Sequence, residues 1–179
     1  VHDVASSDPE SSGMGCTLTL LLVANGRAAM AHVGDTRLYL LREGSIDQLS
    51  TDHTVVAELV RNAQITPESA RDHELSSALT RAVGIQETVE VETLIFDVLP
   101  DDVLPLCSDG VSGAFESAGE IAAVLETDDI AEGPRRLIDL ANERGGADNA
   151  TAVVVAVGAP DDERLSAPHL RRTVRADLG

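Results

Sequence analysis

Residues 16–35 read CTLTLLLVANGRAAMAHVGD and place two apolar runs on either side of an Asn-Gly pair. The runs, Cys16 to Val23 and Arg27 to Val33, have the length and composition of β-strands. Asn25-Gly26 is typical of the two-residue turn of a hairpin. A Gly-Asp pair then interrupts the pattern, and Arg37 to Arg42 is predicted as a third short strand. Three such strands in a row predict an antiparallel meander.

After residue 50 the apolar spacing becomes helical. Four apolar residues fall on one helical face: Val55, Val56, Leu59 and Val60. Thr66-Pro67 predicts a second helix, because Thr is a favourable N-cap and Pro suits the first helical position. One more short helix is predicted around Leu75, Leu79 and Val83.

The rest of the chain alternates between strand and helix patterns. Strands are predicted at Val89 to Val98, Val103 to Ser108 and Asn149 to Val157, and helices at Glu116 to Leu125 and Asp129 to Arg144. We expect residues 1–12 to be a loop, 13–158 to be one domain and 159–179 to be a polar tail. The 179 residues suffice for one core of mixed strands and helices, so the fold class is α+β.

The charge of the chain is strongly negative. It has 31 acidic residues against 13 basic ones, all of them Arg, for a formal net charge of −18. Such a surface repels nucleic acid and anionic membranes, so neither is expected as a partner. The two cysteines, Cys16 and Cys107, lack metal or disulfide-scaffold spacing, and no apolar run approaches the ~20 residues of a bilayer span. These features predict a cytoplasmic protein.

Three aspartates stand beside a glycine, or within two residues of one, where strands end or turn: Asp35, Asp109 and Asp148. A strand fixes such a carboxylate in position, and a neighbouring glycine lets backbone and water approach closely. Mg²⁺ and Mn²⁺ prefer hard oxygen ligands of this kind. Aspartate next to glycine is also a common turn residue, so spacing alone leaves a metal site and a purely structural role both open.

Seven strings occur in one order along the chain: SGMGCTL (12–18), VGDTRLYLL (33–41), TDH (51–53), ITPE (65–68), LTRAVG (79–84), LCSDGV (106–111) and GGADNAT (145–151). Together they closely resemble bacterial metal-dependent protein serine/threonine phosphatases of the PPM, or PP2C-type, family. The resemblance covers nearly everything from Ser12 to Val157.

The resemblance implies an α-β-β-α layered β-sandwich with a metal centre at one end. By position, Asp109 and Asp148 match the ligands of two core metals, Mn²⁺ or Mg²⁺, and Asp35 matches a residue that helps to hold a third. The implied reaction is hydrolysis of phosphoserine and phosphothreonine by a metal-bridged hydroxide. The implied partners are a phosphorylated protein substrate and an opposing serine/threonine kinase. Residues 51–84 resemble the family's mobile flap near the active site.

The sequence also departs from the family pattern. The family's domain opens with a strand whose Arg binds substrate phosphate, followed by an Asp-Gly string whose Asp bridges both metals. Neither is found here, so we expect an N-terminally truncated domain of which this chain is the C-terminal part. The chain is then either an incomplete phosphatase or a catalytically inactive phosphatase-like module that binds a phosphoprotein partner. Loss of strands would expose apolar surface, so self-association is also expected.

Several other polar residues have simpler structural interpretations. Cys107 is expected in the core rather than as a nucleophile, because it lies in an apolar strand. Arg37 is expected to pair with a carboxylate in preference to binding phosphate. His53 and His73 are expected at the surface or in capping roles. Ser108 has no partners in a catalytic-triad order.

Overall fold

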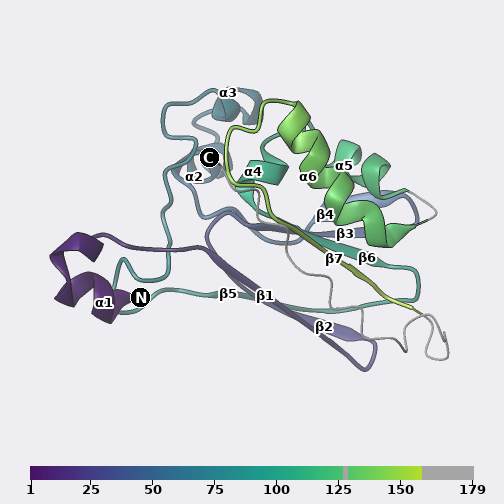
Figure 1. The fold of residues 1–179 in the computed structure, drawn as a ribbon, viewed down its shortest axis with the longest axis horizontal. Coiled ribbons are helices and arrows are strands. Elements are labelled where there is room, and N and C mark those ends of the chain that lie inside the picture. Colours follow the sequence, from purple (N-terminus) through teal and green to yellow (C-terminus); the bar gives the residue numbers. More distant parts are fainter. Residues whose placement is uncertain (127–128, 159–179) are drawn as a thin grey trace. The chain divides into compact units, whose positions relative to one another are not determined.

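The computed structural model describes residues 1–126 and 129–158, so the expected tail at 159–179 lies outside the described residues. Two compact units make up the chain (Figure 1). The first contains Val1–Ala24, Ala28–Thr36 and Ser50–Ile95, and the second contains Asn25–Arg27, Arg37–Leu49 and the residues from Phe96 onward. Each unit is described by itself.

A three-stranded sheet supplies the frame of the first unit. Its order is β1-β2-β5, with β1 at Leu18–Ala24, β2 at Arg27–Val33 and β5 at Glu92–Asp97. The turn between β1 and β2 has positive φ at both Asn25 (52°) and Gly26 (74°), which matches the predicted hairpin turn. In β2 the side chains of Ala28, Met30 and His32 are buried. This alternation brings a histidine into the interior of the unit.

The helices of the first unit are short, and most are capped at the N-terminus by a side chain. They are α1 (His2–Ser7), the 3₁₀-helix η1 (Pro9–Ser11), α2 (Val55–Arg61) and α3 (Pro67–Arg71). The predicted cap at Thr66 is confirmed: its hydroxyl accepts the Ser69 N–H, and Ser69 Oγ accepts the Thr66 N–H. Thr54 caps α2 in the same way, by accepting the Ala57 N–H.

Two sequence predictions for the first unit are wrong. The N-terminal segment forms α1 and η1 instead of a loop, because local side chains satisfy its backbone: Ser7 Oγ donates to the Asp3 carbonyl and Asp8 accepts the Glu10 N–H. The helix predicted around Leu75, Leu79 and Val83 does not form. The Thr80 and Val83 N–H groups donate to the carbonyls of His53 and Cys16, so tertiary bonds replace the helical ladder.

A four-stranded antiparallel sheet forms the second unit, in the order β4-β3-β6-β7. The strands are β3 (Arg37–Arg42), β4 (Ser45–Gln48), β6 (Val103–Cys107) and β7 (Ala152–Ala156). The predicted meander is therefore wrong, because β3 pairs with β4 and β6 and belongs to a different sheet from β2. Pro105 occupies a central strand, where it pairs with Val154 of β7.

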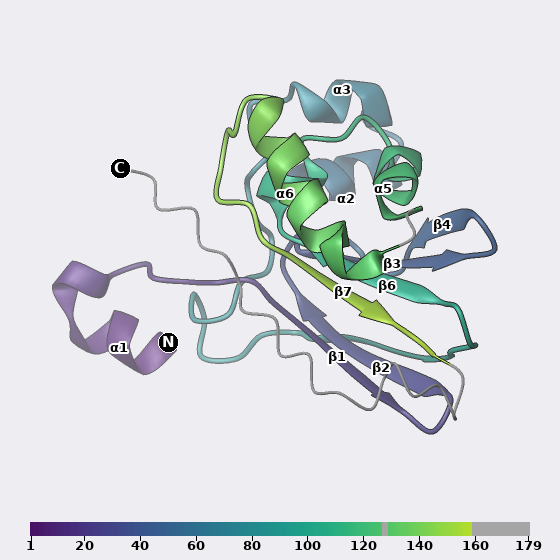
Figure 2. The same ribbon diagram turned by 45° about the vertical axis from the view of Figure 1, so that its right-hand side comes forward.

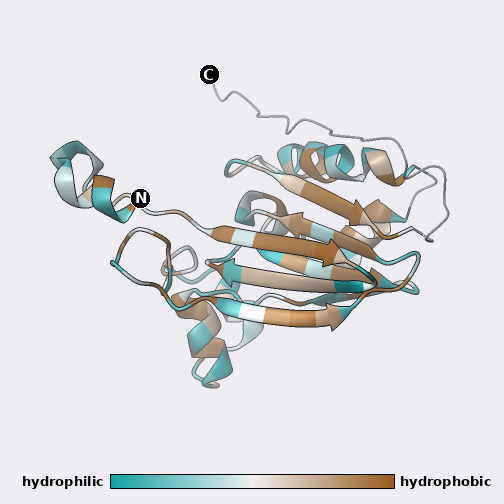
Figure 3. Cartoon of the chain, turned by 90° about the horizontal axis from the view of Figure 1, so that it is seen from below, coloured by the Kyte–Doolittle hydropathy of each residue, from teal (hydrophilic) through white to brown (hydrophobic). Residues whose placement is uncertain are grey.

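Helices cover this sheet and complete the core of the second unit. They are α4 (Asp109–Ser112), α5 (Ala118–Leu125), the 3₁₀-helix η2 (Ile130–Glu132) and α6 (Gly133–Glu143). Figure 2 shows α5 and α6 side by side over one face of the sheet. The core residues are Tyr39, Leu41, Cys107, Val111, Phe115, Ile121, Ala122, Leu125 and Leu137. Figure 3 shows hydrophobic residues along many of the strands.

The helices of the described residues are short. The longest, α6, has 11 residues, and none in the described part of the chain has both the length and the apolar character to cross a bilayer.

Candidate metal centre

Asp109 and Asp148 lie on two loops of the second unit that end and begin neighbouring strands. Asp109 follows β6 and opens α4, while Asp148 stands four residues before β7. Since β6 and β7 pair antiparallel, with Cys107 opposite Ala152, the two loops emerge at the same end of the sheet. The pairing of β6 with β7 therefore brings together two aspartates that are 39 positions apart in the sequence.

Ser108 ties the two loops to each other. Its backbone N–H donates to the Thr151 carbonyl at 3.0 Å. Its hydroxyl donates to the Asn149 carbonyl at 3.2 Å and accepts the Thr151 N–H at 3.0 Å. The hydroxyl thus donates one hydrogen bond and accepts another between the two loops. Three hydrogen bonds from one residue fix the backbones that carry Asp109 and Asp148.

Gly110 lets these backbones touch. A methyl group added at Gly110 would lie 2.5 Å from the carbonyl oxygen of Asn149 and 3.2 Å from the carbonyl carbon of Asp148. Any larger residue would push the Asp109 loop away from the Asp148 loop. The glycine after Asp109 is therefore required by close packing, independently of its turn chemistry.

The two carboxylates are exposed and held by their own loops. Asp109 Oδ1 accepts the Gly110 N–H at 2.9 Å, and Asp148 Oδ1 accepts the Asn149 N–H at 2.6 Å. Each bond fixes the side chain and leaves Oδ2 able to face a cation without breaking the turn. Exposed carboxylate oxygens on rigid backbone are the hard ligands that Mg²⁺ and Mn²⁺ take together with several waters. The residues present fit a divalent metal of this class.

Asp35 lies in the first unit, on the turn between β2 and β3. Gly34 before it has a φ of +114°, and a methyl group there would lie 2.3 Å from Thr17 Cγ2. Only glycine fits this conformation and this contact. The Asp35 side chain is half-buried. That Asp35 acts in one centre with Asp109 and Asp148 remains a prediction.

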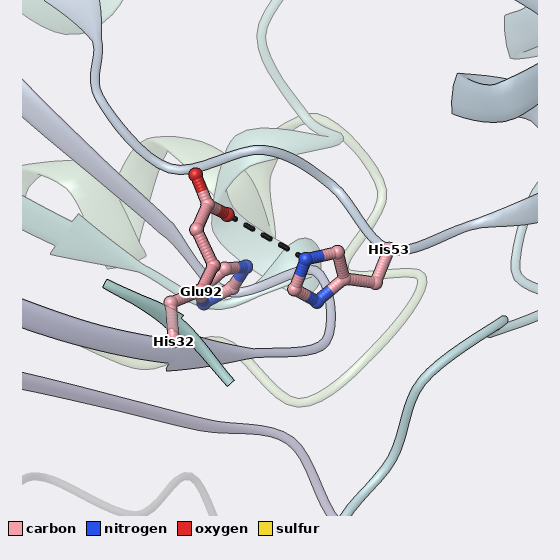
Figure 4. A group of neighbouring side chains, drawn as sticks. All are labelled: His32, His53 and Glu92. Atoms are coloured by element: carbon pink, nitrogen blue, oxygen red, sulfur yellow. Dashed lines mark ion pairs between the residues drawn. The ribbon is translucent and has the colours of Figure 1, made fainter. Parts of the chain in front are cut away.

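A second cluster of candidate metal ligands lies inside the first unit. His32, His53 and Glu92 place one ligand atom each within 4.8 Å of one another (Figure 4). The two imidazole rings stack, with centroids 4.9 Å apart. The prediction of a surface position for His53 is wrong, since only 3% of it is exposed. Its backbone N–H and its Nδ1 are hydrogen-bonded to Gly34, 19 positions earlier in the chain, and no local spacing signals this.

The hydrogen bonds of this cluster argue against a metal there. His32 Nε2 donates to the Thr51 carbonyl at 3.0 Å, and its Nδ1 accepts from Thr19 Oγ1 at 2.8 Å. His53 Nδ1 accepts the Gly34 N–H at 3.1 Å, so the proton of the neutral ring is on Nε2. Metal binding at Nε2 would move that proton to Nδ1, where it would oppose the Gly34 N–H. The ring nitrogens are satisfied without an ion.

His53 is therefore a neutral residue between a cation and an anion. Its Nε2 lies 3.3 Å from Arg81 Nη1 and 3.5 Å from Glu92 Oε2. Burial lowers the pKa of His53, and the positive charge of Arg81 lowers it further. The contact with Glu92 is thus a polar contact of the neutral ring rather than an ion pair. Because Nε2 carries the proton of the neutral ring, it cannot accept a hydrogen bond from Arg81.

The structure also tests the predictions for Cys107 and His73. Cys107 is fully buried, and burial raises the pKa of its thiol to about 12, so it is a core residue and not a nucleophile. His73 Nδ1 accepts the Leu75 N–H, which confirms a capping role.

Comparison with known proteins assigns the chain to a family. The sequence profile of the family described as "Protein phosphatase 2C" matches residues 2–102, more than half of the chain. The chain belongs to this metal-dependent phosphatase family.

Two bacterial proteins of this family are similar to the chain. The serine/threonine protein phosphatase PstP of Mycobacterium tuberculosis is 41% identical over 150 residues, which are 84% of this chain and 29% of PstP. The serine/threonine phosphatase stp of Listeria welshimeri is 36% identical over 158 residues, 84% of this chain and 60% of that protein. The chain thus spans less than two thirds of either relative.

A solved structure gives the same assignment. The catalytic domain of PstP in complex with two manganese ions has a TM-score of 0.79 at 37% identity and covers 88% of this chain and 66% of that one. The fold is therefore the α+β fold of protein phosphatase 2C, with two antiparallel sheets, represented here in part.

Proposed function

We propose that this chain carries part of a phosphatase domain that hydrolyses phosphoserine and phosphothreonine in proteins. The observation that carries the proposal is the pair of exposed carboxylates, Asp109 and Asp148, on loops that Ser108 joins by three hydrogen bonds. Rigid placement of metal ligands matters because a cation site works only when its carboxylates are held at fixed positions.

Each residue has a distinct part in the proposed reaction. Asp109 and Asp148 hold divalent cations, Mn²⁺ or Mg²⁺, and Asp35 contributes to a third. When bound, such metals supply Lewis-acid activation of water and neutralise phosphate charge. Gly110 and Ser108 keep the ligand loops at contact distance. Water is the proposed attacking group, so no covalent phospho-enzyme is expected, and the buried thiol of Cys107 takes no part.

The proposed substrate and partners follow from the names of the relatives. PstP and stp are named as serine/threonine phosphatases. For this chain we propose a phosphorylated protein as substrate and a serine/threonine kinase that opposes it. A net charge of −18 would repel an anionic phosphoprotein unless bound cations offset it, which gives the metals a second role in binding.

The test is phosphate release from a phosphothreonine peptide by the purified chain across a Mn²⁺ titration. We expect hydrolysis that requires Mn²⁺ and falls by at least about 100-fold in Asp109→Asn, the scale of losing a key electrostatic group. Asp139→Asn is the matched control, because Asp139 is exposed and pairs with Arg135 along its own helix. Full activity in Asp109→Asn would refute the proposal.

A second candidate is a catalytically inactive module that binds a phosphoprotein. It is favoured by the partial coverage of the relatives, 29% of PstP and 60% of the Listeria protein. The same titration decides between them: peptide binding without phosphate release at any Mn²⁺ concentration supports the module.

Self-association of this chain is supported by exposed apolar side chains. Leu18, Leu20 and Leu22 of β1 are 57%, 60% and 63% exposed and alternate onto one face of the strand. Exposed leucines in a row on an edge strand favour association. Light scattering that gives a monomer mass up to high concentration would contradict this expectation.

A further inference from the structure

The turn that carries Asp35 is hydrogen-bonded to one histidine through the residue before Asp35. The Gly34 N–H donates to His53 Nδ1 at 3.1 Å, and the Gly34 carbonyl accepts the His53 backbone N–H at 2.8 Å. Both backbone polar groups of Gly34 are therefore satisfied by His53. The residue directly before Asp35 has its orientation set from a segment 19 positions further along the chain.

His53 also stands at the base of the flap segment, residues 51–84. Its carbonyl accepts the Thr80 N–H at 2.8 Å, and the next pair along, Val55 N–H to Ala78 carbonyl, is also 2.8 Å. Thr54 and Leu79 form an antiparallel bridge between these bonds. The two ends of the flap segment are thus paired next to His53. We call the paired residues 53–55 and 78–80 the flap stem.

The imidazole of His53 is itself held in place. It is buried against the His32 ring, whose nitrogens are occupied by Thr19 and Thr51. Glu92 accepts both the backbone N–H and the hydroxyl of Thr51, at 3.1 and 3.0 Å. This network fixes the residues on either side of the ring, so that Nδ1 has one direction in which to accept a hydrogen bond.

We infer that His53 is a positioning residue that joins the Asp35 turn to the flap stem through its Nδ1 acceptor. Displacement of the flap stem moves His53. The backbone amide of Gly34, which donates to His53 and directly precedes Asp35, moves with it. The cation-binding consequence rests on the proposed function, in which Asp35 helps to hold a metal. The mechanical consequence, which concerns the hydrogen bond from the Gly34 N–H to His53 Nδ1, does not depend on it.

Two variants of equal shape isolate the acceptor. In His53→Asn the side-chain oxygen can occupy the place of Nδ1, whereas His53→Leu puts a methyl group there with the same branching. Both remove the ring stack and leave a similar gap, so their difference reports the acceptor alone. His53→Gln is the third variant, because its longer amide reaches the Nε2 position near Arg81 and misses Nδ1.

The first readout is amide hydrogen exchange at Gly34, measured by NMR on the full chain, with β2 amides as an internal reference. We expect exchange about tenfold faster in His53→Leu than in His53→Asn, as loss of one buried acceptor implies. Gln should behave like Leu, and serves in its place if the Leu variant does not fold. Equal exchange in the Asn variant and in the Leu or Gln variant would overturn the inference.

The second readout is Mn²⁺ affinity of the site that depends on Asp35, defined by comparison with Asp35→Asn. We expect the Asn variant to bind like the unmodified chain and the Leu variant about tenfold more weakly, the usual effect of losing a residue that orients a ligand. If Asp35→Asn changes no Mn²⁺ binding, the proposed metal role of Asp35 fails. The exchange readout then still decides the role of His53.

Discussion

Replacement of Gly110 by alanine sets two physical effects against each other at the candidate metal centre. Gly110 lies in the short helix α4, where alanine is favoured over glycine by about 0.5–1 kcal/mol. The added methyl group would lie 2.5 Å from the Asn149 carbonyl oxygen and 2.9 Å from its carbon. These are backbone atoms, so the contact cannot be relieved by rotation of a side chain.

The larger of these two energies decides whether Gly110→Ala raises or lowers stability. Overpacking of this kind costs about 1–3 kcal/mol, which exceeds the gain in helix propensity. For a chain of this size each 1 kcal/mol corresponds to roughly 2–4 °C in Tm, so Gly110→Ala is expected to lower Tm by several degrees. Because the clash separates the Asp109 loop from the Asp148 loop, Mn²⁺ affinity is expected to fall by about tenfold or more.

The assay is thermal unfolding by circular dichroism with and without Mn²⁺, with Gly119→Ala as matched control. Gly119 also lies in a helix, α5, but a methyl group there meets only Ser117 Oγ at 3.5 Å, an ordinary contact. Gly119→Ala should therefore keep or raise Tm and leave Mn²⁺ binding unchanged. If Gly110→Ala behaves like Gly119→Ala in both measurements, the close approach of the two loops is refuted.

Three further predictions concern stability and reactivity. Asp102, 1% exposed, accepts the Leu99 N–H at 2.7 Å, so Asp102→Ala should lower the free energy of urea unfolding by about 1–3 kcal/mol; no change would contradict this. Because the pKa of His53 is lowered in the folded state, the unfolded chain binds the extra proton, and stability should fall as pH drops below about 6.5. His53→Asn should flatten that pH dependence, and an equal slope would count against it. With a thiol-reactive dye, exposed Cys16 should react at once and buried Cys107, whose thiol pKa is raised to about 12, only on unfolding; equal rates would disprove the burial.

Local chemistry allowed much of the fold to be predicted. The Asn25-Gly26 turn, the strands on either side of it and the capped helix after Thr66 depend on residues close in sequence, and all are found. The strand β4 was missed because Ile46 is its one apolar residue in SIDQ, too little for an alternating pattern. The predicted meander was wrong because the chain turns at Gly34, after β2, and β3 then belongs to a second sheet.

The residues of the candidate site also differ in whether local sequence could predict them. Asp109 and Asp148 could be proposed from glycine-flanked turns and from the family resemblance. The roles of Ser108 and Gly110 could not, because they arise where two loops meet across paired strands. His53 was misplaced for a similar reason: its partners lie far from it in sequence, and a lone histidine carries no spacing signal.

The central claim is that Asp109 and Asp148 form one divalent-cation site, and Mn²⁺ binding tests it most directly. Free Mn²⁺ would be followed by electron paramagnetic resonance during titration of the chain, of Asp148→Asn and of Asp139→Asn. The account predicts specific binding to the unmodified chain and to Asp139→Asn, with loss in Asp148→Asn. Equal binding by Asp148→Asn, or no specific binding by the unmodified chain, would contradict it.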